Sequence, residues 1–563
     1  MVFTKKNIVQ AFIFTGLIWF IVVLLIVPNI GTVTNVFWQN GEFTTRAIER
    51  LRDASRAMAA LRNSFIIAPI LSITVGFVGV TLVLITEYFK IFGSKILRLG
   101  YMTTLLYSGI VLVSGYVFLY GQNGIITNVL VRIIPNLEQD WFSGFGAVLF
   151  VMTFAATGNH MIFIRNALRS VDYQTIEAAR NMGASSFTIL RRVVLPVLLP
   201  SLTAVTVFTF LGGLSAIAAP LLVGGPEFRT ITPMILQLSR IQGSRDIAAL
   251  LAIILGVSSI ILLCVLTLLE KRGHYLSVSK VKTDLVKQKI KNPIIRLLVH
   301  IYAYALFLIY IAPVVIIIMF SFTDAYTIAR REFSLTAFTL DNYIFVFSQA
   351  IDPLVTSAMY SVMAAGGVAM LMLLVCRLIT KHKSKLTTVV EYSLMIPWLL
   401  PTVLIALGLV TTFSRPQWFM FNQPLTNTTM IMVLGYLIIC IPFTLRMTRA
   451  AFFSIDNTLE DAAKNLGAKA YYTFLRIILP VILPSVMAIF ALNFNSLLAE
   501  FDMSIFMYNP LAVPLGVEIE SLTTADGGGD GAALVFVYSV IMMAIGAVVL
   551  YLVYGRSSRD ISR

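Results

Sequence analysis

The feature that most constrains this chain is a series of apolar runs, each of about 20 residues, that recurs along its whole length. A run of this length lets a helix cross about 30 Å of hydrocarbon. Hydrophobic residues make up 58% of the 563 residues and charged residues only 12%. A soluble domain with that ratio would expose too much apolar surface. The sequence therefore predicts an all-α polytopic membrane protein.

The apolar runs predict about twelve transmembrane helices, arranged as two parallel six-helix repeats. The expected spans of the first half are approximately 9–28, 64–86, 97–120, 142–163, 200–223 and 247–269. Those of the second half are approximately 298–321, 354–379, 388–412, 428–445, 484–508 and 533–554. We accordingly divide the chain into a first unit (1–270), a basic linker (271–297) and a second unit (298–563).

The distribution of basic residues predicts the orientation. If the N-terminus is cytoplasmic, every lysine falls in a segment assigned to the cytoplasmic side, whereas the arginines divide between the two sides. The positive-inside rule supports this topology, with both termini in the cytoplasm. The net charge of +15 then reflects an anionic inner leaflet and requires no nucleic acid. We expect the linker to be solvated near lipid headgroups, with a regulatory or partner-binding role as the alternative.

The chain carries no motif for covalent chemistry. It contains no P-loop pattern, no H-E-x-x-H and no Cys/His cluster. Its three cysteines all fall inside apolar runs and are expected to be small buried hydrophobes. We therefore expect no catalytic residue, no metal site and no cofactor bound by this chain. The glycine-rich stretch 523–534 is expected to be a flexible outer loop.

A polar segment is duplicated. "EAARNMGASSFTILRRVVLPVLLPS" runs from Glu177 to Ser201, and "DAAKNLGAKAYYTFLRIILPVILPS" runs from Asp461 to Ser485; 12 of the 25 positions are identical. Both copies lie between the fourth and fifth expected span of their half, on the cytoplasmic side. Because each half has an even number of spans, a pseudo-twofold axis along the membrane normal should relate them. Two equivalent surfaces suit a partner that is a symmetric dimer.

The residues of the duplicated segment predict a short helix that ends in a turn. Small alanines favour helix and let another backbone approach closely; they are Ala178, Ala179, Ala462 and Ala463. Gly183 and Gly467 can adopt positive φ and end that helix. The Leu–Pro pairs at 195–196 and 479–480 are expected to set the entry into the next span.

The spacing E-A-A, three residues, G, eleven residues, L-P resembles the EAA loop of ABC-importer permeases of the binding-protein-dependent type. The first half matches in full at Glu177, Ala178, Ala179, Gly183, Leu195 and Pro196. In the second half Asp461 replaces the glutamate, which keeps the charge and shortens its reach, while Ala462, Ala463, Gly467, Leu479 and Pro480 match. These residues lie in expected EAA loops at 165–200 and 446–484.

The resemblance implies a type I importer fold and a function. The EAA loop would form a coupling helix that inserts into a groove on an ATPase subunit. The chain would then be a single fused permease in the bacterial inner membrane, sitting on two copies of a separate ATPase that binds ATP and Mg. An extracytoplasmic solute-binding protein would deliver the solute, and alternating access would pass it inward.

A second group of polar residues lies in the eleventh expected span, "ALNFNSLLAEFDMSIFMY". It places Asn493, Asn495, Glu500 and Asp502 in one helix, where ionisable groups usually face a cavity. When the two halves are aligned on their duplicated segments, Ala216 and Ala218 stand where the second half has the two carboxylates. We therefore expect an asymmetric pathway. The alternative is a cluster at the helix end, or an ion pair with an arginine.

Fused permeases of this length are most similar to ferric-iron, thiamine and 2-aminoethylphosphonate importers. The carboxylates Glu500 and Asp502 favour a cationic solute, ferric ion first, with 2-aminoethylphosphonate, thiamine or polyamine as alternatives. A rival class is a twelve-helix secondary transporter driven by an ion gradient. That class would not explain the twin polar loops.

Overall fold

The computed structural model describes residues 5–554, apart from 40, 106–108, 135, 170, 242, 271–285, 331–334, 382–383, 421, 454 and 525–527. The described chain is built almost entirely of helices. A short antiparallel pair, β1 (Trp38–Gln39) and β2 (Glu42–Phe43), aligns Trp38 with Phe43. The predicted all-α class is confirmed.

The first half of the chain contains the following helices, where η marks a 3-10 or π segment: α1 (Lys5–Phe20), η1 (Ile21–Ile26), α2 (Val27–Phe37), α3 (Arg46–Asp53), α4 (Ser55–Val83), η2 (Leu84–Tyr88), α5 (Ser94–Tyr101), η3 (Met102–Leu105), α6 (Gly109–Tyr120), α7 (Ile125–Ile133), α8 (Gly144–Leu168), α9 (Tyr173–Asn181), α10 (Ser186–Ile189), η4 (Leu190–Val194), α11 (Leu195–Ser215), α12 (Ala218–Val223), α13 (Ile231–Arg240) and α14 (Arg245–Glu270).

The second half contains α15 (Pro293–Ser321), α16 (Ala325–Arg330), η5 (Leu335–Ala337), α17 (Asp341–Gln349), α18 (Asp352–Lys381), α19 (Lys385–Ser393), α20 (Ile396–Leu399), α21 (Thr402–Phe413), α22 (Thr429–Phe453), α23 (Asn457–Asn465), α24 (Ala470–Thr473), η6 (Phe474–Ile478), α25 (Leu479–Leu498), α26 (Ser504–Met507), α27 (Leu515–Thr524) and α28 (Gly528–Tyr554).

Eleven helical stretches within the described residues are long and apolar enough to cross a membrane. They are Phe12–Phe37, Ser55–Tyr88, Gly109–Ile133, Gly144–Leu168, Ser186–Ser215, Arg245–Val265, Pro293–Ser321, Asp352–Lys381, Thr429–Phe453, Ala470–Leu498 and Gly529–Val553. The protein is thus a polytopic membrane protein, as the sequence predicts.

The ninth expected span, 388–412, is not one helix. It is divided into α19, α20 and α21, and only α21 is a continuous apolar helix, of 12 residues. Pro397 lies in the first turn of α20 and Pro401 caps α21 in an extended conformation, with φ −60° and ψ 141°. Proline ends a preceding helix because its ring clashes and it has no N–H to donate. The third expected span, 97–120, is likewise divided into α5, η3 and α6.

The fifth and eleventh expected spans begin earlier than the Leu–Pro pairs suggest. Their helices start in the polar loops and run on through Pro196 and Pro480. In both halves a five-residue π turn, η4 or η6, directly precedes the Leu–Pro pair. A π turn shifts the hydrogen-bonding register, so the helix accommodates the proline instead of ending there.

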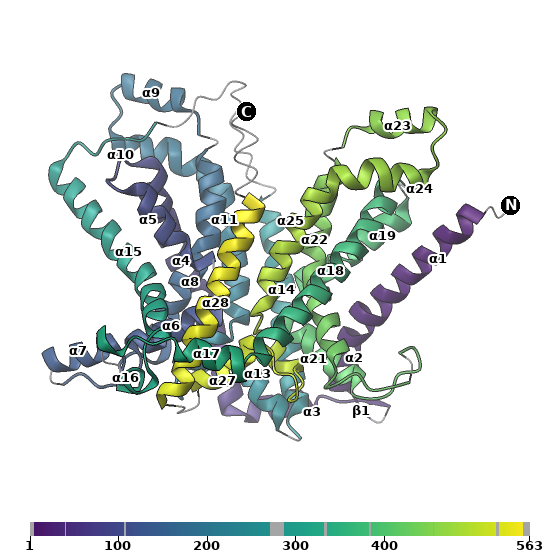
Figure 1. Ribbon diagram of the computed structural model, residues 1–563, viewed down its shortest axis with the longest axis horizontal. Coiled ribbons are helices and arrows are strands. Elements are labelled where there is room, and N and C mark those ends of the chain that lie inside the picture. The colour runs from purple at the N-terminus through teal and green to yellow at the C-terminus, as the bar shows by residue number, and fades with distance from the viewer. Residues whose placement is uncertain are drawn as a thin grey trace.

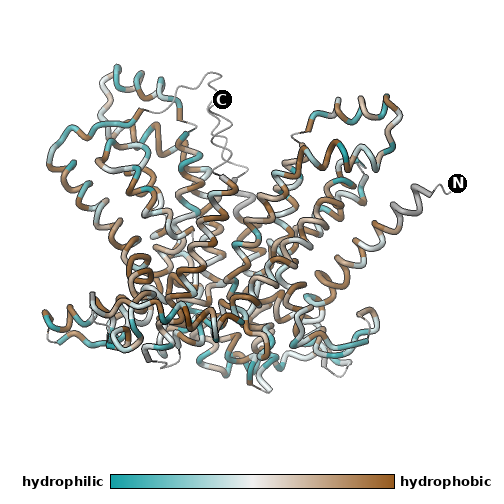
Figure 2. Tube along the Cα trace, in the orientation of Figure 1, coloured by the Kyte–Doolittle hydropathy of each residue, from teal (hydrophilic) through white to brown (hydrophobic). Residues whose placement is uncertain are grey.

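The long helices converge at one end of the molecule and spread into two arms at the other (Figure 1). The short helices α9 and α23, which we call the loop helices, lie at the tips of separate arms. Figure 2 shows hydrophobic residues along the arms and hydrophilic residues towards both ends. That distribution matches an apolar band flanked by two aqueous faces.

The first helices of the two halves each pack against the opposite half. Leu17 and Leu24 from α1 and η1 share a buried cluster with Tyr360 and Met372 from α18. From α15, the ring of Tyr310 packs 5.5 Å from that of Tyr101, whose hydroxyl donates to the carbonyl of Ala303 at 2.7 Å. The two sequence units are therefore interlocked in space.

The glycine-rich stretch 523–534 is not the flexible loop that its composition predicts. Outside residues 525–527, which the structure does not describe, α27 ends at Thr524 and α28 begins at Gly528. Gly529 is buried, and a Cβ on it would overlap the carbonyl group of Ala325 in α16. The missing side chain thus permits a close backbone contact.

Candidate functional site

The two loop helices begin in the same way. The carboxylate of Asp172 accepts the N–H of Gln174 at 3.0 Å, and that of Asp456 accepts the N–H of Thr458 at 2.9 Å. Each aspartate is the N-cap of its helix and satisfies a backbone donor that has no partner within the helix. Hydrogen bonds from Thr458 lower the pKa of Asp456. The two caps occupy equivalent positions of the internal repeat.

The two loop helices also end in the same way. Gly183 has φ 85° and Gly467 has φ 81°, in the left-handed region. The N–H of Gly183 bonds to the carbonyl of Arg180 at 2.9 Å, and that of Ala184 to the carbonyl of Ala179 at 3.0 Å. The second half repeats this paired-bond turn, which is the Schellman arrangement. The sequence-based prediction for both glycines is confirmed.

The predicted loop residues divide into an outer and an inner set. Glu177, Ala178, Asp461 and Ala462 are exposed, whereas Ala179 and Ala463 are buried. The buried alanines let each short helix lie close against the bundle. The exposed residues leave a surface free for a partner at each arm tip.

Four exposed apolar side chains extend these surfaces and were missed by the sequence analysis. Met182 is 81% exposed and its equivalent Leu466 is 89% exposed. Phe187 and its equivalent Tyr471 are 70% and 75% exposed. A signal was present in the sequence, since both copies keep large side chains at these two positions. Exposed apolar groups repeated in pairs are typical of a protein-binding surface.

The second loop helix is held to the bundle by an ion-pair cluster. Arg377 of α18 donates to Glu460 at 3.0 and 2.9 Å, and Lys381 lies 2.7 Å from the same carboxylate. The hydrogen bond from Arg377, with a further one from Lys381, lowers the pKa of Glu460 to about 2. The equivalent position of the first loop helix is Ile176, which is fully buried.

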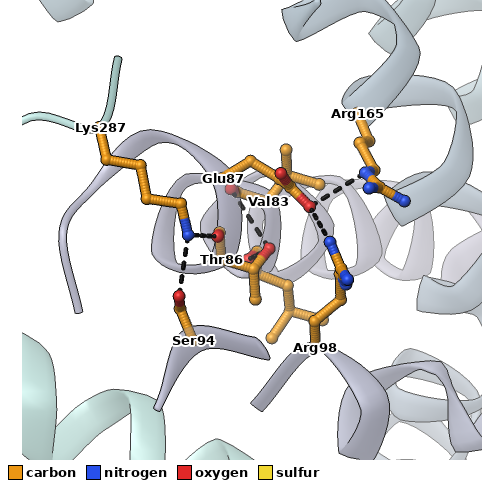
Figure 3. A network of polar contacts seen from close by, with 8 residues as sticks. Val83, Thr86, Glu87, Ser94, Arg98, Arg165 and Lys287 are labelled. Atoms are coloured by element: carbon orange, nitrogen blue, oxygen red, sulfur yellow. Dashed lines mark hydrogen bonds and ion pairs between the residues drawn. The ribbon is translucent and has the colours of Figure 1, made fainter. Parts of the chain in front are cut away.

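The first loop helix is held instead by the basic linker. Arg180 donates to the side chain of Gln288, and the backbone of Gln288 pairs with that of Tyr88 and Lys90 at 2.8 and 2.9 Å. Lys287 donates to the carbonyl of Thr86 at 2.6 Å and lies 2.8 Å from the hydroxyl of Ser94 (Figure 3). Burial, with the charges of Arg98 and Lys95 nearby, lowers the pKa of Lys287.

The expectation of a solvated linker is therefore wrong for Lys287 and Gln288. They dock onto the end of α4 and η2, where Glu87 pairs with Arg98 at 3.1 Å and Arg165 at 2.9 Å (Figure 3). The linker backbone at Gln288 is held by main-chain hydrogen bonds, as an extended segment is when it adds to an exposed backbone edge. The charge composition of the linker does not reveal such bonds. Residues 271–285 of the expected linker lie outside the described residues.

The four polar residues expected in the eleventh span do not lie in one helix. The helix α25 ends at Leu498, so Glu500 and Asp502 follow it. Asn493 is buried and donates to the hydroxyl of Thr444 on α22 at 2.7 Å. Asn495 is half-buried, and Asp502 is exposed. Helix ends depend on tertiary contacts, which hydropathy does not encode.

Glu500 supports a neighbouring helix. Its carboxylate accepts the N–H groups of Met503 at 2.8 Å and Ser504 at 3.1 Å, and the Ser504 hydroxyl at 2.6 Å. The hydroxyl of Tyr436 lies 2.7 Å from that of Ser504. These contacts satisfy the first turn of α26. They match the alternative of a helix-end cluster that the sequence left open.

Within the described part of the chain, no group of three or more His, Cys, Asp or Glu side chains could hold a metal ion. His160, whose ring is fully buried, packs against Gly79: a Cβ there would lie 2.6 Å from the Cβ of His160. The exposed surfaces that the structure repeats in both halves are those of the two loop helices.

Comparison with known proteins finds the same internal repeat as the structure. The family model for the binding-protein-dependent transport system inner membrane component matches twice, at residues 65–274 and 374–563. Each match contains one loop helix.

Similar proteins include the probable ABC transporter permease protein y4fN of Sinorhizobium fredii, 35% identical over 548 residues that cover 96% of each chain. The putative ferric transport system permease protein FbpB 1 of Haemophilus influenzae is 20% identical over 89% of this chain and 79% of its own length. The putative 2-aminoethylphosphonate transport system permease protein PhnV of Salmonella typhimurium is 27% identical over 27% of this chain and 55% of its own. The chain belongs to the family of binding-protein-dependent ABC transport permeases and carries the family domain twice, as a fused double-length permease.

Proposed function

We propose that this chain is the transmembrane subunit of an ATP-driven importer that receives a small solute from an extracytoplasmic binding protein. The observation that carries the proposal is the pair of loop helices, which share their N-cap, their C-terminal turn and their exposed apolar side chains at equivalent positions of the two halves. Such a matched pair suits two copies of one ATPase subunit, and ATP and Mg would bind to those subunits.

The loop helices are proposed to be the coupling helices, through Glu177, Ala178, Ala179 and Gly183 in the first and Asp461, Ala462, Ala463 and Gly467 in the second. The chain would lie in the bacterial inner membrane, with these helices and both termini in the cytoplasm. The arms then spread towards the cytoplasm (Figure 1). Closure of two ATPase subunits would draw the arms together and open the opposite end, which is alternating access.

The names of the relatives divide between ferric ion and oxyanions, so they support a small solute without naming one. Ferric ion is favoured by the sequence on the strength of Glu500 and Asp502. The three hydrogen bonds at the Glu500 carboxylate reduce that support, because those oxygens are already engaged. Asn493, Asn495 and Asp502 remain candidates for the substrate pathway, together with Glu500.

The decisive experiment is transport in proteoliposomes that contain the chain and its ATPase, with the binding protein and solute supplied on the outer side. We expect uptake only when ATP and Mg are present on the loop-helix side. Uptake driven by a proton or sodium gradient without ATP would contradict the proposal and support a secondary transporter.

A double variant tests whether the two carboxylates line the substrate pathway. Glu500→Gln with Asp502→Asn should impair uptake at unchanged thermal stability if the carboxylates line the pathway. If Glu500 only caps α26, the same variant should lose stability in proportion to its loss of uptake. Full uptake at full stability would exclude both roles.

A further inference from the structure

An arginine lies within one of the membrane-spanning helices. Arg446 is in α22, about two turns before its end at Phe453, and its side chain is exposed. It forms no ion pair with any carboxylate in the described part of the chain. Arg446 lies one residue beyond the tenth expected span, 428–445, but inside the helix Thr429–Phe453. A charged side chain in a spanning helix is costly in lipid, so such groups usually face a water-filled cavity or reach the aqueous interface.

Arg446 breaks the internal repeat. The equivalent position of the first half is Ile162, in the helix α8. The loop helices keep their residues across the two halves, because both are expected to meet the same partner. A solute has no such symmetry, so a contact for it can be present in one half alone.

The guanidinium group of Arg446 stacks on an aromatic ring. Its central carbon lies 4.2 Å from the ring centroid of Trp398, in the short helix α20. This cation–π contact holds the guanidinium group against the ring. Its N–H groups have no hydrogen-bond partner among the described residues, so they are available for two parallel hydrogen bonds to an oxyanion.

The cluster spans the boundary between the halves. The ring of Trp398 lies 6.4 Å from that of Phe208, which belongs to α11 of the first half. The side chains of Trp398 and Phe208 are 40% and 50% exposed. The helix α11 lies on the inner side of its arm (Figure 1). A motion of α20 relative to α11 would change this contact.

Building on the importer function proposed above, we propose that Arg446 contacts the transported solute and that this solute carries an oxyanion, such as a sulfate, phosphonate or carboxylate group. The guanidinium group supplies the charge and the paired donors. Trp398 sets its orientation, and Phe208 provides an apolar wall from the opposite half.

Binding to the full chain in lipid nanodiscs tests the proposal. In a chain with Trp19, Trp38, Trp141 and Trp418 changed to Phe, Trp398 is the only tryptophan. Sodium sulfate and sodium methylphosphonate are titrated at constant ionic strength against sodium chloride. We expect a saturable change in Trp398 fluorescence with the oxyanions and none with chloride.

Three variants decide the result. Arg446→Gln should weaken oxyanion binding about tenfold or more, because two charge-assisted hydrogen bonds are lost. Arg446→Lys should weaken oxyanion binding about threefold, since the ammonium point charge replaces the paired donors of the guanidinium group. This variant is used in place of Arg446→Gln if Arg446→Gln does not fold. Arg415→Gln, which removes the same charge from an exposed position, should bind as the parent does.

An equal response to chloride, or unchanged oxyanion binding in whichever Arg446 variant folds, would overturn the proposal. The importer function and the oxyanion proposal can be refuted independently of each other. If the chain does not assemble with an ATPase, the importer function fails whatever the fluorescence shows. If assembly and ATP-driven uptake persist without Arg446-dependent binding, only the oxyanion inference fails.

Discussion

Arg377 at the end of α18 holds Glu460 of the second loop helix through two hydrogen bonds, of 3.0 and 2.9 Å. At the equivalent point of the first loop helix the buried side chain of Ile176 packs in the interior, and the linker residue Gln288 bonds to Arg180 instead. Two surfaces of the same shape are thus anchored by different forces. A perturbation of charge should therefore affect one arm tip more than the other.

A double-mutant cycle measures the Arg377–Glu460 contact. We expect Glu460→Gln and Arg377→Gln each to weaken ATPase association about fivefold, on the basis of about 1 kcal/mol for a partly exposed pair. The double variant should be no weaker than Glu460→Gln alone, because that single variant already removes the contact with Arg377. Additive effects would show that the pair does not support the loop helix.

The pH dependence of the same pair follows from the lowered pKa of Glu460, about 2. A carboxyl pKa that is lower in the folded state adds stability above its unfolded value of about 4.3. That stability is lost as the pH falls towards about 2. The difference in melting temperature between the wild type and Glu460→Gln should stay constant from pH 5 to 8 and shrink below about pH 4. A difference that varies within pH 5–8 would contradict this assignment.

The turn glycines should respond to backbone preference rather than to side-chain volume. A Cβ on Gly183 or Gly467 would meet nothing within 4 Å, but positive φ costs a non-glycine residue roughly 1–2 kcal/mol. Asparagine tolerates this conformation better than alanine, and a β-branched residue tolerates it least. We expect ATPase co-purification to decrease in the order Gly, Asn, Ala, Val at either position. A wild-type level with Gly183→Val would refute the role of the turn.

Much of this site can be predicted from the sequence, since it depends on local chemistry. The glycine-ended turns of the loop helices follow from residue types at fixed offsets, and the long apolar runs predict most of the spans. The caps Asp172 and Asp456 were found only in the structure. The helix α25 ends at Leu498, before Glu500, and the contact of α26 with Tyr436 that follows joins residues distant in the chain. The stacking of Arg446 on Trp398 also joins residues distant in the chain. Periodicity carries no information about such contacts.

The exposed apolar pair on the loop helices should be required for ATPase binding. Replacing Met182 and Leu466 with Asp places a charge in a surface that must be desolvated on docking, which costs several kcal/mol. We expect the double variant to insert normally and to lose ATPase co-purification, with each single variant intermediate. Leu511→Asp is the control, because Leu511 is 94% exposed and lies outside the loop helices. Retained ATPase binding in the double variant would place the docking surface elsewhere.

The start of α28 allows a matched comparison of two nearby glycines. A Cβ on Gly529 would overlap the carbonyl group of Ala325, whereas one on Gly531 has its nearest neighbour, the carbonyl oxygen of Leu522, at an ordinary 3.5 Å. Gly529→Ala should lower the melting temperature of the purified protein, because overpacking against backbone costs about 1–3 kcal/mol or more. Gly531→Ala should leave it unchanged or raise it, since alanine is favoured over glycine in a helix by up to about 1 kcal/mol. Equal effects of the two substitutions would show that α28 does not pack against α16 through Gly529.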